Sequence, residues 1–317
     1  MPGIVALCGG VGGAKLAYGL ARALPPHELT IVVNTGDDFQ HFGLTICPDV
    51  DTVMYTLADS DNRDTGWGRA AETWAVMDEV GRLGGDTWFK LGDKDLALHL
   101  MRRQQLDRRE RLTTVTRHLA ARLGVKSAVL PMSDEPVRTI VETSEGDLAF
   151  QDYFVRRRCE PKVTGFRFEG AAQARPSPEV AAALSRPELS GVVICPSNPY
   201  VSIGPMLAVA GIREELERTK VPVLAVSPIV AGRAIKGPAA KMMAELGGAV
   251  SGLEVARLYT NLIDAMLLDE QDRALLEERR EDDARLFFAP TVMRTPEDRI
   301  ALARACLRLL AELSCSL

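Results

Sequence analysis

The chain has 317 residues, of which 46% are apolar and 26% are charged, and this composition excludes a disordered or fibrous protein. The length is enough for one large domain or two modest ones. Its 38 basic and 43 acidic residues give a net charge of −5, which argues against nucleic acid held by bulk positive charge. Neither an apolar run of about 18 residues nor a signal-peptide pattern is found, so we expect a cytoplasmic protein with no membrane partner.

The six cysteines are scattered along the chain and form no CxxC pair. This spacing favours reduced thiols in a cytoplasmic protein over a zinc site or a disulfide framework.

The first 34 residues contain a strand, a glycine-rich turn, a helix and a second strand. Residues 4–7 are an apolar run, residues 16–24 are good helix formers that end at Pro25, and residues 29–34 are rich in β-branched side chains. Such a βαβ unit predicts a parallel sheet with right-handed crossovers.

The middle of the chain is mainly helical in pattern. Apolar residues recur at helical spacing over 73–83, 96–105 and 112–123, and we interpret residues 53–125 as a helical insertion. Residues 146–155 and 163–169 are predicted strands, joined by a charged turn, that form a ribbon or extend the sheet.

The α/β alternation then returns. Strands are predicted over 192–195, 221–226, 265–268 and 284–288, helices over 212–219, 239–246, 253–262 and 300–313, and a solvated helix face over 277–283. The sequence therefore predicts one Rossmann-like domain over 1–317, with a doubly wound, mainly parallel sheet and a helical insertion at about 53–125.

In such a sheet the ligand lies at the carboxyl ends of the strands, so three loops are candidates. The loop after residue 7 contains Gly10, Gly12, Gly13 and Lys15, whose backbone N–H groups and ammonium suit a phosphate. It is neither a Walker loop nor a dinucleotide fingerprint, and a tight turn without a ligand is the alternative.

The second loop carries four aspartates within 15 residues, namely Asp37, Asp38, Asp49 and Asp51. A carboxylate about 4 Å from a phosphate oxygen is repelled by roughly 4 kcal/mol at an effective dielectric of ~20, so these residues suggest a divalent cation between them. Oxygen ligands favour Mg²⁺, Mn²⁺ or Ca²⁺. We expect Asp38 and Asp51 to bind metal or substrate, whereas Asp37 and Asp49 suit helix caps and turns equally well.

The third loop spans residues 196–205. Ser197, Asn198, Ser202 and Gly204 offer uncharged donors to phosphates or a base, with a proline-rich turn as the alternative.

The three tryptophans fall within 22 residues. Trp67, Lys90 and Asp93 could border a flat heterocycle, and Asp95 and His99 share one face if both lie on a helix.

These motifs together resemble the 2-phospho-L-lactate transferase family, which makes the precursor of the deazaflavin coenzyme F-420. The resemblance is carried by residues 9–15 (GGVGGAK), 34–38 (NTGDD), 47–55 (CPDVDTVMY), 66–68 (GWG), 91–99 (LGDKDLALH), 131–134 (PMSD), 150–155 (FQDYFV) and 196–199 (PSNP). Lys94 stands where many relatives have arginine.

The resemblance implies a metal-dependent transferase of substituted phosphate groups. A guanosine-diphosphate-linked hydroxy acid of the phospholactate, phosphoenolpyruvate or phosphoglycerate type would donate to the ribityl hydroxyl of the deazaflavin Fo, and GMP would leave. It places the deazaflavin near Asp51 and Lys90, Mg²⁺ at Asp38 and Asp51, and the donor phosphates at the glycines. No covalent nucleophile stands out, so we expect direct attack by the acceptor hydroxyl, with Asp38 or Asp51 as base.

Two other classes are weighed against this one. A non-catalytic nucleotide-sugar-binding regulator of the gluconeogenesis-factor type resembles the chain at the glycines but has a different motif at residues 48–52. An NAD-dependent dehydrogenase is disfavoured by Lys15 and by the excess of aspartates. We also expect a homodimer.

Overall fold

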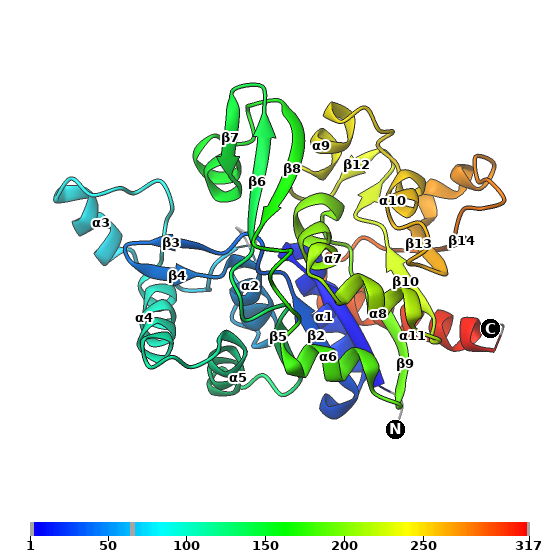
Figure 1. Ribbon diagram of the computed structural model, residues 1–317, viewed down its shortest axis with the longest axis horizontal. Coiled ribbons are helices and arrows are strands. Elements are labelled where there is room, and N and C mark those ends of the chain that lie inside the picture. The colour runs from blue at the N-terminus through cyan, green and yellow to red at the C-terminus, as the bar shows by residue number, and fades with distance from the viewer. Residues whose placement is uncertain (1–2, 64–66, 316–317) are drawn as a thin grey trace.

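A seven-stranded parallel sheet forms the centre of the molecule (Figure 1). The structure is a computed structural model that describes residues 3–63 and 67–315. Within that part of the chain the strand order is β14-β13-β10-β9-β1-β2-β5. The strands are β1 (Gly3–Cys8), β2 (Leu29–Val33), β5 (Ala128–Pro131), β9 (Leu189–Ile194), β10 (Val223–Val226), β13 (Ala265–Asp269) and β14 (Arg285–Ala289). The predicted Rossmann-like parallel sheet is confirmed.

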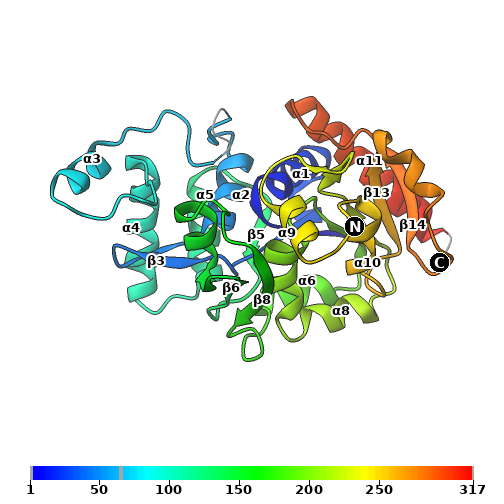
Figure 2. The same cartoon turned by 90° about the horizontal axis from the view of Figure 1, so that it is seen from above.

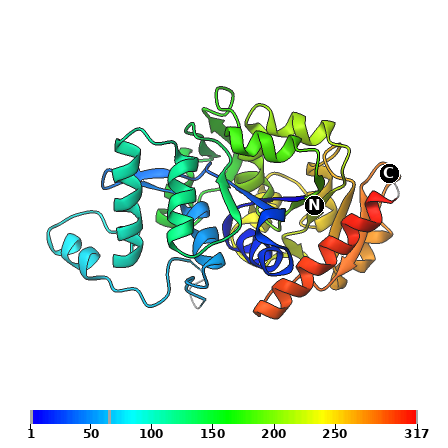
Figure 3. The same ribbon diagram turned by 90° about the horizontal axis from the view of Figure 1, so that it is seen from below.

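Alternate residues of β1 enter two separate hydrophobic cores, which explains its unbroken apolar sequence. Ala6 packs into the core under α1 (Gly10–Ala23), α2 (Pro48–Leu57), α5 (Leu112–Arg122) and α11 (Pro296–Ser314). Val5 packs into the opposite core, under α6 (Pro178–Ser185), α7 (Gly204–Ala208), α8 (Ile212–Arg218) and α10 (Gly252–Leu258). Figure 2 shows α1 and α11 on one side of the sheet and α6 and α8 on the other, and Figure 3 shows α11 running beside α1.

The connection from β2 to β5 holds the three helices predicted over 73–83, 96–105 and 112–123, a fourth helix where the sequence predicted the end of the aspartate loop, and one hairpin that the sequence pattern missed. Its helices are α2, α3 (Ala75–Arg82), α4 (Asp93–Asp107) and α5, and its hairpin is β3 (Phe39–His41) with β4 (Leu44–Ile46). The hairpin strands are too short to show an alternating pattern, and their turn needs positive φ at both Phe42 and Gly43. The hairpin, α3 and α4 project from the body of the molecule (Figure 1).

A separate three-stranded antiparallel sheet corrects the prediction for residues 146–169. Here β6 (Arg138–Thr143) lies between β7 (Gly146–Ala149) and β8 (Val163–Glu169), so the two predicted strands do not pair with each other. Residues 152–156, predicted as part of a strand, form a π-helical turn, η2 (Asp152–Arg156), in which Tyr153 is fully buried.

The remaining elements are short. They are η1 (Pro26–Glu28), η3 (Pro199–Ile203), η4 (Glu270–Leu276), α9 (Ala239–Glu245), and the hairpin β11 (Ile229–Val230) with β12 (Arg233–Ala234). The predicted helix face over 277–283 is wrong, because these residues form exposed turns after η4, held by the Asp283 carboxylate. Within the described ranges, no helix is both long enough and apolar enough to span a bilayer.

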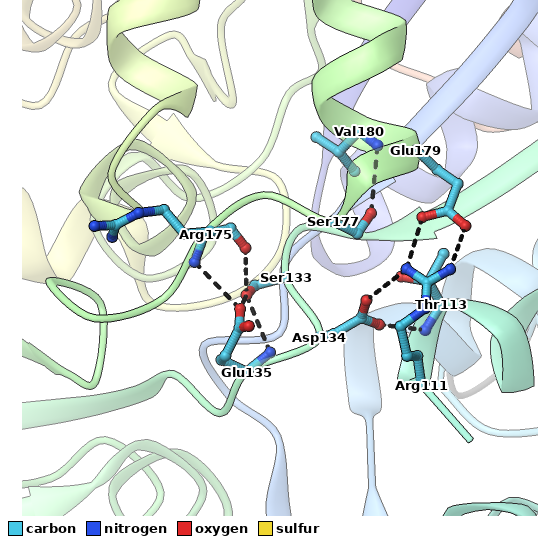
Figure 4. A network of polar contacts seen from close by, with 9 residues as sticks. All are labelled: Arg111, Thr113, Ser133, Asp134, Glu135, Arg175, Ser177, Glu179 and Val180. Carbon is cyan, nitrogen blue, oxygen red and sulfur yellow. Dashed lines mark hydrogen bonds and ion pairs between the residues drawn. The ribbon is translucent and has the colours of Figure 1, made fainter. Parts of the chain in front are cut away.

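The loop after β5 owes its PMSD sequence to a structural network (Figure 4). Asp134 accepts from the backbone N–H of Thr113 at 2.7 Å, which gives a partner to an N–H group in the first turn of α5. Asp134 also pairs with Arg111 at 3.1 Å. Arg111 also forms a two-pronged ion pair with Glu179 of α6. The buried Ser133 hydroxyl lies 2.7 Å from both the Arg175 carbonyl and a Glu135 carboxylate oxygen. The motif therefore ties α5 and α6 to the end of β5.

Candidate functional site

The glycine sequence after β1 is not an open loop, contrary to its interpretation from sequence. Helix α1 begins at Gly10, which has a φ of 64°, so Gly12 and Gly13 lie in its first turn. A Cβ on Gly12 would overlap the Pro196 carbonyl oxygen, and one on Gly13 would lie 2.5 Å from the Ser197 Oγ. These glycines let the start of α1 pack directly against the loop after β9.

The polar side chains of the loop after β9 are largely engaged with the protein. The Ser197 Oγ accepts from the Gly9 N–H at 3.0 Å and donates to the Gly9 carbonyl at 2.9 Å. The Asn198 Oδ1 accepts from two N–H groups of η3, at Tyr200 and Val201. Ser202 is buried against Gly9, and Gly204 begins α7 close to Phe168. The structure thus brings this loop to the start of α1, because β1 and β9 are neighbouring parallel strands.

Asn34 is hydrogen-bonded to both Asp37 and Asp49, the two aspartates that the sequence assigned equally well to caps and turns or to a ligand. Its amide nitrogen donates to Asp37 and, at 3.0 Å, to Asp49, and its Oδ1 accepts from the Gly36 N–H. Burial raises the pKa of Asp49 to about 6, although Asn34 and the Gly10 N–H act in the opposite direction. Burial and then the neighbouring Asp49 raise the pKa of Asp37.

Asp38 is a buried carboxyl group with one free oxygen. It is 4% exposed, and its Oδ1 has no hydrogen-bond partner among the described residues. Burial raises its pKa to about 7, against the hydrogen bond from Cys47 and the positive charges of Arg138 and Arg102. Asp51 lies close enough to raise this pKa further. Such a group is poised to accept a proton or a cation near neutral pH.

Asp51 is bound by a side chain that the sequence analysis did not single out. It lies in the first turn of α2, and the fully buried Arg102 of α4 holds both of its oxygens, with 3.1 Å between Nη1 and Oδ2. Against the effect of burial, Asp51 raises the pKa of Arg102. His99 Nδ1 lies 3.7 Å from the same carboxylate.

Asp95 and His99 do share one face of α4, as their spacing predicts. The His99 Nε2 lies 3.4 Å from Asp95, which also accepts from the Tyr55 hydroxyl at 2.5 Å. Burial acts to raise the pKa of Asp95, but the contacts with His99 and Tyr55 hold it below its ordinary value.

The three tryptophans that cluster in the sequence lie in two separate places in the structure. Trp67 is 49% exposed and lies edge-on to Trp74 at 6.4 Å. Trp88 packs at the β3–β4 hairpin against Phe39, at 5.9 Å, and under the Arg156 guanidinium. Gly66 of the motif at 66–68 lies outside the described residues.

Lys90 and Asp93 also differ in what surrounds them. Lys90 is exposed just before α4. Asp93 begins α4, but its carboxylate accepts from the Thr73 hydroxyl and from the N–H groups of Ala75 and Val76, so it caps α3. These hydrogen bonds hold the pKa of Asp93 below its ordinary value.

Lys15 lies in a pocket on the other side of α2 from Arg102. Its ammonium donates to the Met293 carbonyl at 3.0 Å, and Thr52, Thr56 and Trp67 line the same pocket. Burial first, and then the positive charges of Arg299 and Lys236, lower the pKa of Lys15.

Comparison with known proteins identifies the family. The sequence model of the family described as 2-phospho-L-lactate transferase CofD matches residues 4–295. A phosphoenolpyruvate transferase of Streptomyces griseus is 42% identical over 315 residues, covering 98% of each chain. A 2-phospho-L-lactate transferase of Methanosarcina mazei is 41% identical over 271 residues, covering 86% of this chain and 88% of that one. The chain belongs to the 2-phospho-L-lactate transferase CofD family.

Solved structures agree with this family in fold. A UPF0052 family protein of Bacillus halodurans superposes with a TM-score of 0.62 at 15% identity, covering 96% of this chain and 98% of that one. The resemblance inferred from the motifs is thereby confirmed at the level of family and fold, and the family is one of transferases.

The donor atoms of this CofD family member fit a hard cation at Asp38. Its orphaned carboxylate oxygen is a ligand of the kind that Mg²⁺ prefers. Asp51 could add an oxygen only by sharing it with Arg102, which already binds both. Asp51, Asp95 and His99 also present ligand atoms within 4.8 Å of one another, but Tyr55 and Arg102 occupy part of this set.

Sequence reasoning missed Arg102, which binds Asp51, and Arg299, which lines the same pocket as Lys15. Each is a basic residue in phase with the apolar positions of an amphipathic helix, near Leu98 in α4 and Leu302 in α11. A charge on an apolar helix face is the one local signal that could have found them, because such a charge is normally paired or functional.

Proposed function

We propose that the chain transfers a phospho-hydroxyacyl group from a guanosine-diphosphate-linked donor to the ribityl hydroxyl of the deazaflavin Fo, releasing GMP, in the synthesis of coenzyme F-420. The relatives are named for transfer of 2-phospho-L-lactate and phosphoenolpyruvate, which supports a donor of this kind. Family membership favours this transferase over the nucleotide-sugar-binding regulator.

The observation that carries the proposal is the state of Asp38. A buried carboxyl group with a free oxygen and a pKa of about 7 can accept a proton from an attacking hydroxyl at neutral pH. Asp51 is less suited to that role, because the Arg102 guanidinium binds both of its oxygens. We therefore assign the role of base to Asp38 and a positioning role to Asp51.

In the reaction, the acceptor hydroxyl oxygen attacks the phosphorus atom that carries the hydroxy acid. The bond from that phosphorus to the bridging oxygen of the diphosphate breaks, GMP leaves with the electron pair, and Asp38 takes the hydroxyl proton. Transfer of this kind depends on positioning and on neutralising charge more than on covalent help from the protein.

Mg²⁺ is the proposed cofactor, with Asp38 and Asp51 as its proposed ligands, and it would supply charge neutralisation at the diphosphate. The Asp38 oxygen that takes the proton would then be a different one from the oxygen that binds the cation. For the deazaflavin we keep Asp51, Lys90, Trp67 and Asp93 as proposed neighbours. Asp51 and Lys90 are the stronger candidates, because the Asp93 carboxylate already caps α3 and Trp67 lines the pocket of Lys15 on the other side of α2.

The experiment that tests the function is release of GMP with Fo and each of three donors, carrying lactate, enolpyruvate or glycerate. We expect turnover by the wild-type chain with at least one donor, and a loss of about 100-fold or more in kcat for Asp38→Asn. Asp107→Asn, a surface change at the end of α4, is the matched control and should keep wild-type turnover. Near-normal turnover by Asp38→Asn would remove Asp38 from the reaction, and no turnover with any donor would overturn the proposed function.

A further inference from the structure

Helix α4 buries polar side chains while leaving two apolar ones exposed. His99 and Arg102 are 1% and 0% exposed, whereas Leu100 and Met101, which lie between them in the chain, are 53% and 47% exposed. Buried charged groups add less to stability than apolar side chains of similar volume, so proteins that keep them often do so for specificity or function. Packing alone therefore does not account for the buried face of α4.

His99 lies at the centre of this face, and its two ring nitrogens meet different kinds of partner. Its Nδ1 lies 3.0 Å from Nη1 of Arg102, and the Asp51 carboxylate is 3.7 Å away, beyond hydrogen-bond distance. Its Nε2 lies 3.4 Å from Asp95 Oδ1. A guanidinium only donates and a carboxylate accepts, so the ring stands between a donor at Nδ1 and an acceptor at Nε2.

These two contacts determine which ring nitrogen carries the proton. Because Arg102 can only donate, Nδ1 must offer its lone pair to the guanidinium, and the proton of the neutral ring is then on Nε2, facing Asp95. A ring with an N–H group at Nδ1 would place two donors 3.0 Å apart. Asp95 is held in place from its other side by the Tyr55 hydroxyl, at 2.5 Å.

The guanidinium of Arg102 depends on its terminal nitrogens for its orientation. Its Nε has no hydrogen-bond partner among the described residues. Its Nη1 lies near three acceptors, namely His99 Nδ1, Asp51 Oδ2 at 3.1 Å and the Thr45 carbonyl at 3.2 Å. Asp51 and Thr45 belong to α2 and β4, so His99 is the acceptor that α4 itself supplies to this nitrogen.

We infer that His99 is a positioning residue for the transfer, which orients Arg102 and, through Arg102, the carboxylate of Asp51. Both ring nitrogens face protein groups and the side chain is buried, so His99 acts without touching a substrate. The inference rests on the proposed function for the reaction in which Asp51 takes part. It adds a chain of buried contacts behind that carboxylate, formed by Tyr55, Asp95, His99 and Arg102.

Two amide replacements of His99 separate the roles of its nitrogens. Asparagine carries its amide at the place of Nδ1, where its oxygen can accept from Arg102. Glutamine carries its amide at the place of Nε2, where it can donate to Asp95, but it leaves Arg102 without an acceptor from α4. In the GMP-release assay, His99→Asn should keep kcat/KM for Fo within about threefold of the wild type, whereas His99→Gln should lower it about tenfold or more.

The KM for Fo distinguishes positioning from a structural defect. A smaller folded fraction lowers the apparent kcat and leaves KM unchanged, whereas a displaced Asp51 beside the acceptor raises KM. We expect this rise in His99→Gln and not in His99→Asn. His118→Asn is the matched control, because the His118 ring contacts Gln105 of the same helix rather than Arg102, and it should keep wild-type kinetics. Equal kinetics in His99→Asn and His99→Gln, or faster turnover by His99→Gln, would overturn the inference.

Nuclear magnetic resonance of the wild-type chain tests the network without turnover and without a variant at His99. Long-range proton–nitrogen correlation spectra distinguish a protonated from an unprotonated ring nitrogen, and the chain has four histidines, so replacing each of the other three in turn identifies His99. We expect the proton on Nε2. A proton on Nδ1 would overturn the inference even if no His99 variant folds, and with wild-type turnover it would leave the proposed function standing. A proton on Nε2 without turnover of any donor would reject the proposed function and leave the network intact.

Discussion

Arg102 of α4 binds both carboxylate oxygens of Asp51 of α2 in the interior of the molecule. The Arg102 Nη1 also donates to the Thr45 carbonyl of β4 at 3.2 Å and lies 3.0 Å from His99 Nδ1. One guanidinium therefore connects the hairpin, α2 and α4, and fixes the carboxylate next to Asp38. The projecting part of the chain is joined to the sheet through this charged contact as well as through apolar packing.

Replacing Arg102 by methionine should destabilise the fold strongly. Methionine fills a similar space but leaves the Asp51 carboxylate buried and unpaired, which costs about 3–5 kcal/mol. Arg103→Ala, at the next position but on the exposed face with Asp107, should change the free energy of unfolding by about 0.5 kcal/mol or less. Urea unfolding of the two variants measures the difference, and equal stabilities would show that the Arg102–Asp51 pair contributes nothing.

The raised pKa of Asp38 makes stability depend on pH in a defined direction. Its pKa is about 7 in the folded protein, whereas an ordinary aspartate in an unfolded chain titrates near 4. Between these values the folded state holds a proton that the unfolded state has released, so the free energy of unfolding decreases as pH rises from about 4 to about 7.

Asp38→Asn removes this contribution and should be more stable than the wild type at pH 8, with the gap closing as pH falls toward 4. The slope of the difference should approach about 1.4 kcal/mol per pH unit between those limits, because one proton is involved. Urea unfolding in EDTA at several pH values measures it. A difference that does not change with pH would mean that Asp38 titrates normally.

The sequence predicted well those features that depend on residues close together in the chain. The strands β1, β2, β9, β10 and β13 are continuous apolar runs, and the βαβ pattern at the start of the chain predicted that they form a parallel sheet. The strand β5 was missed because it is four residues long and ends at Pro131, and β6 because half of its residues are only partly buried. Asp95 and His99 were paired correctly because a helix fixes their spacing.

The residues that complete the site could not be paired from local pattern. Arg102 binds Asp51, 51 positions away in the sequence, and Arg299 lines the same pocket as Lys15 although most of the chain separates them. The hydrogen bonds of Ser197 and Asn198 could not be predicted for a related reason. Their polar groups satisfy backbone N–H groups where two loops meet, and no composition rule separates that use from ligand binding.

Asp93→Ala should loosen α3 without destabilising the sheet. The Asp93 carboxylate accepts from the N–H groups of Ala75 and Val76 at 3.1 Å, so its loss leaves the start of α3 uncapped. Loss of a cap costs about 0.5–2 kcal/mol, and because α3 projects from the molecule we expect this loss to increase local unfolding of α3. Hydrogen exchange at residues 77–82 should accelerate about 3-fold to 30-fold, whereas Glu79→Ala, on the same helix, should leave it nearly unchanged. Unchanged exchange in Asp93→Ala would leave ligand binding as the better account of Asp93.

Gly12→Ala should test the close packing at the start of α1. Gly12 is helical and has ordinary negative φ, so alanine is favoured there by helix propensity by about 1 kcal/mol. Its Cβ would nevertheless overlap the Pro196 carbonyl oxygen, which is backbone and cannot rotate away. We therefore expect a net loss of about 1–3 kcal/mol. Gly81→Ala, within α3, is the matched control, because a Cβ there would lie 3.5 Å from the Thr87 Cγ2, an ordinary contact distance. This variant should be as stable as the wild type or more stable. If Gly12→Ala unfolds at the wild-type urea concentration, the loop after β9 can move away from α1, and the contact between the two does not explain the glycine.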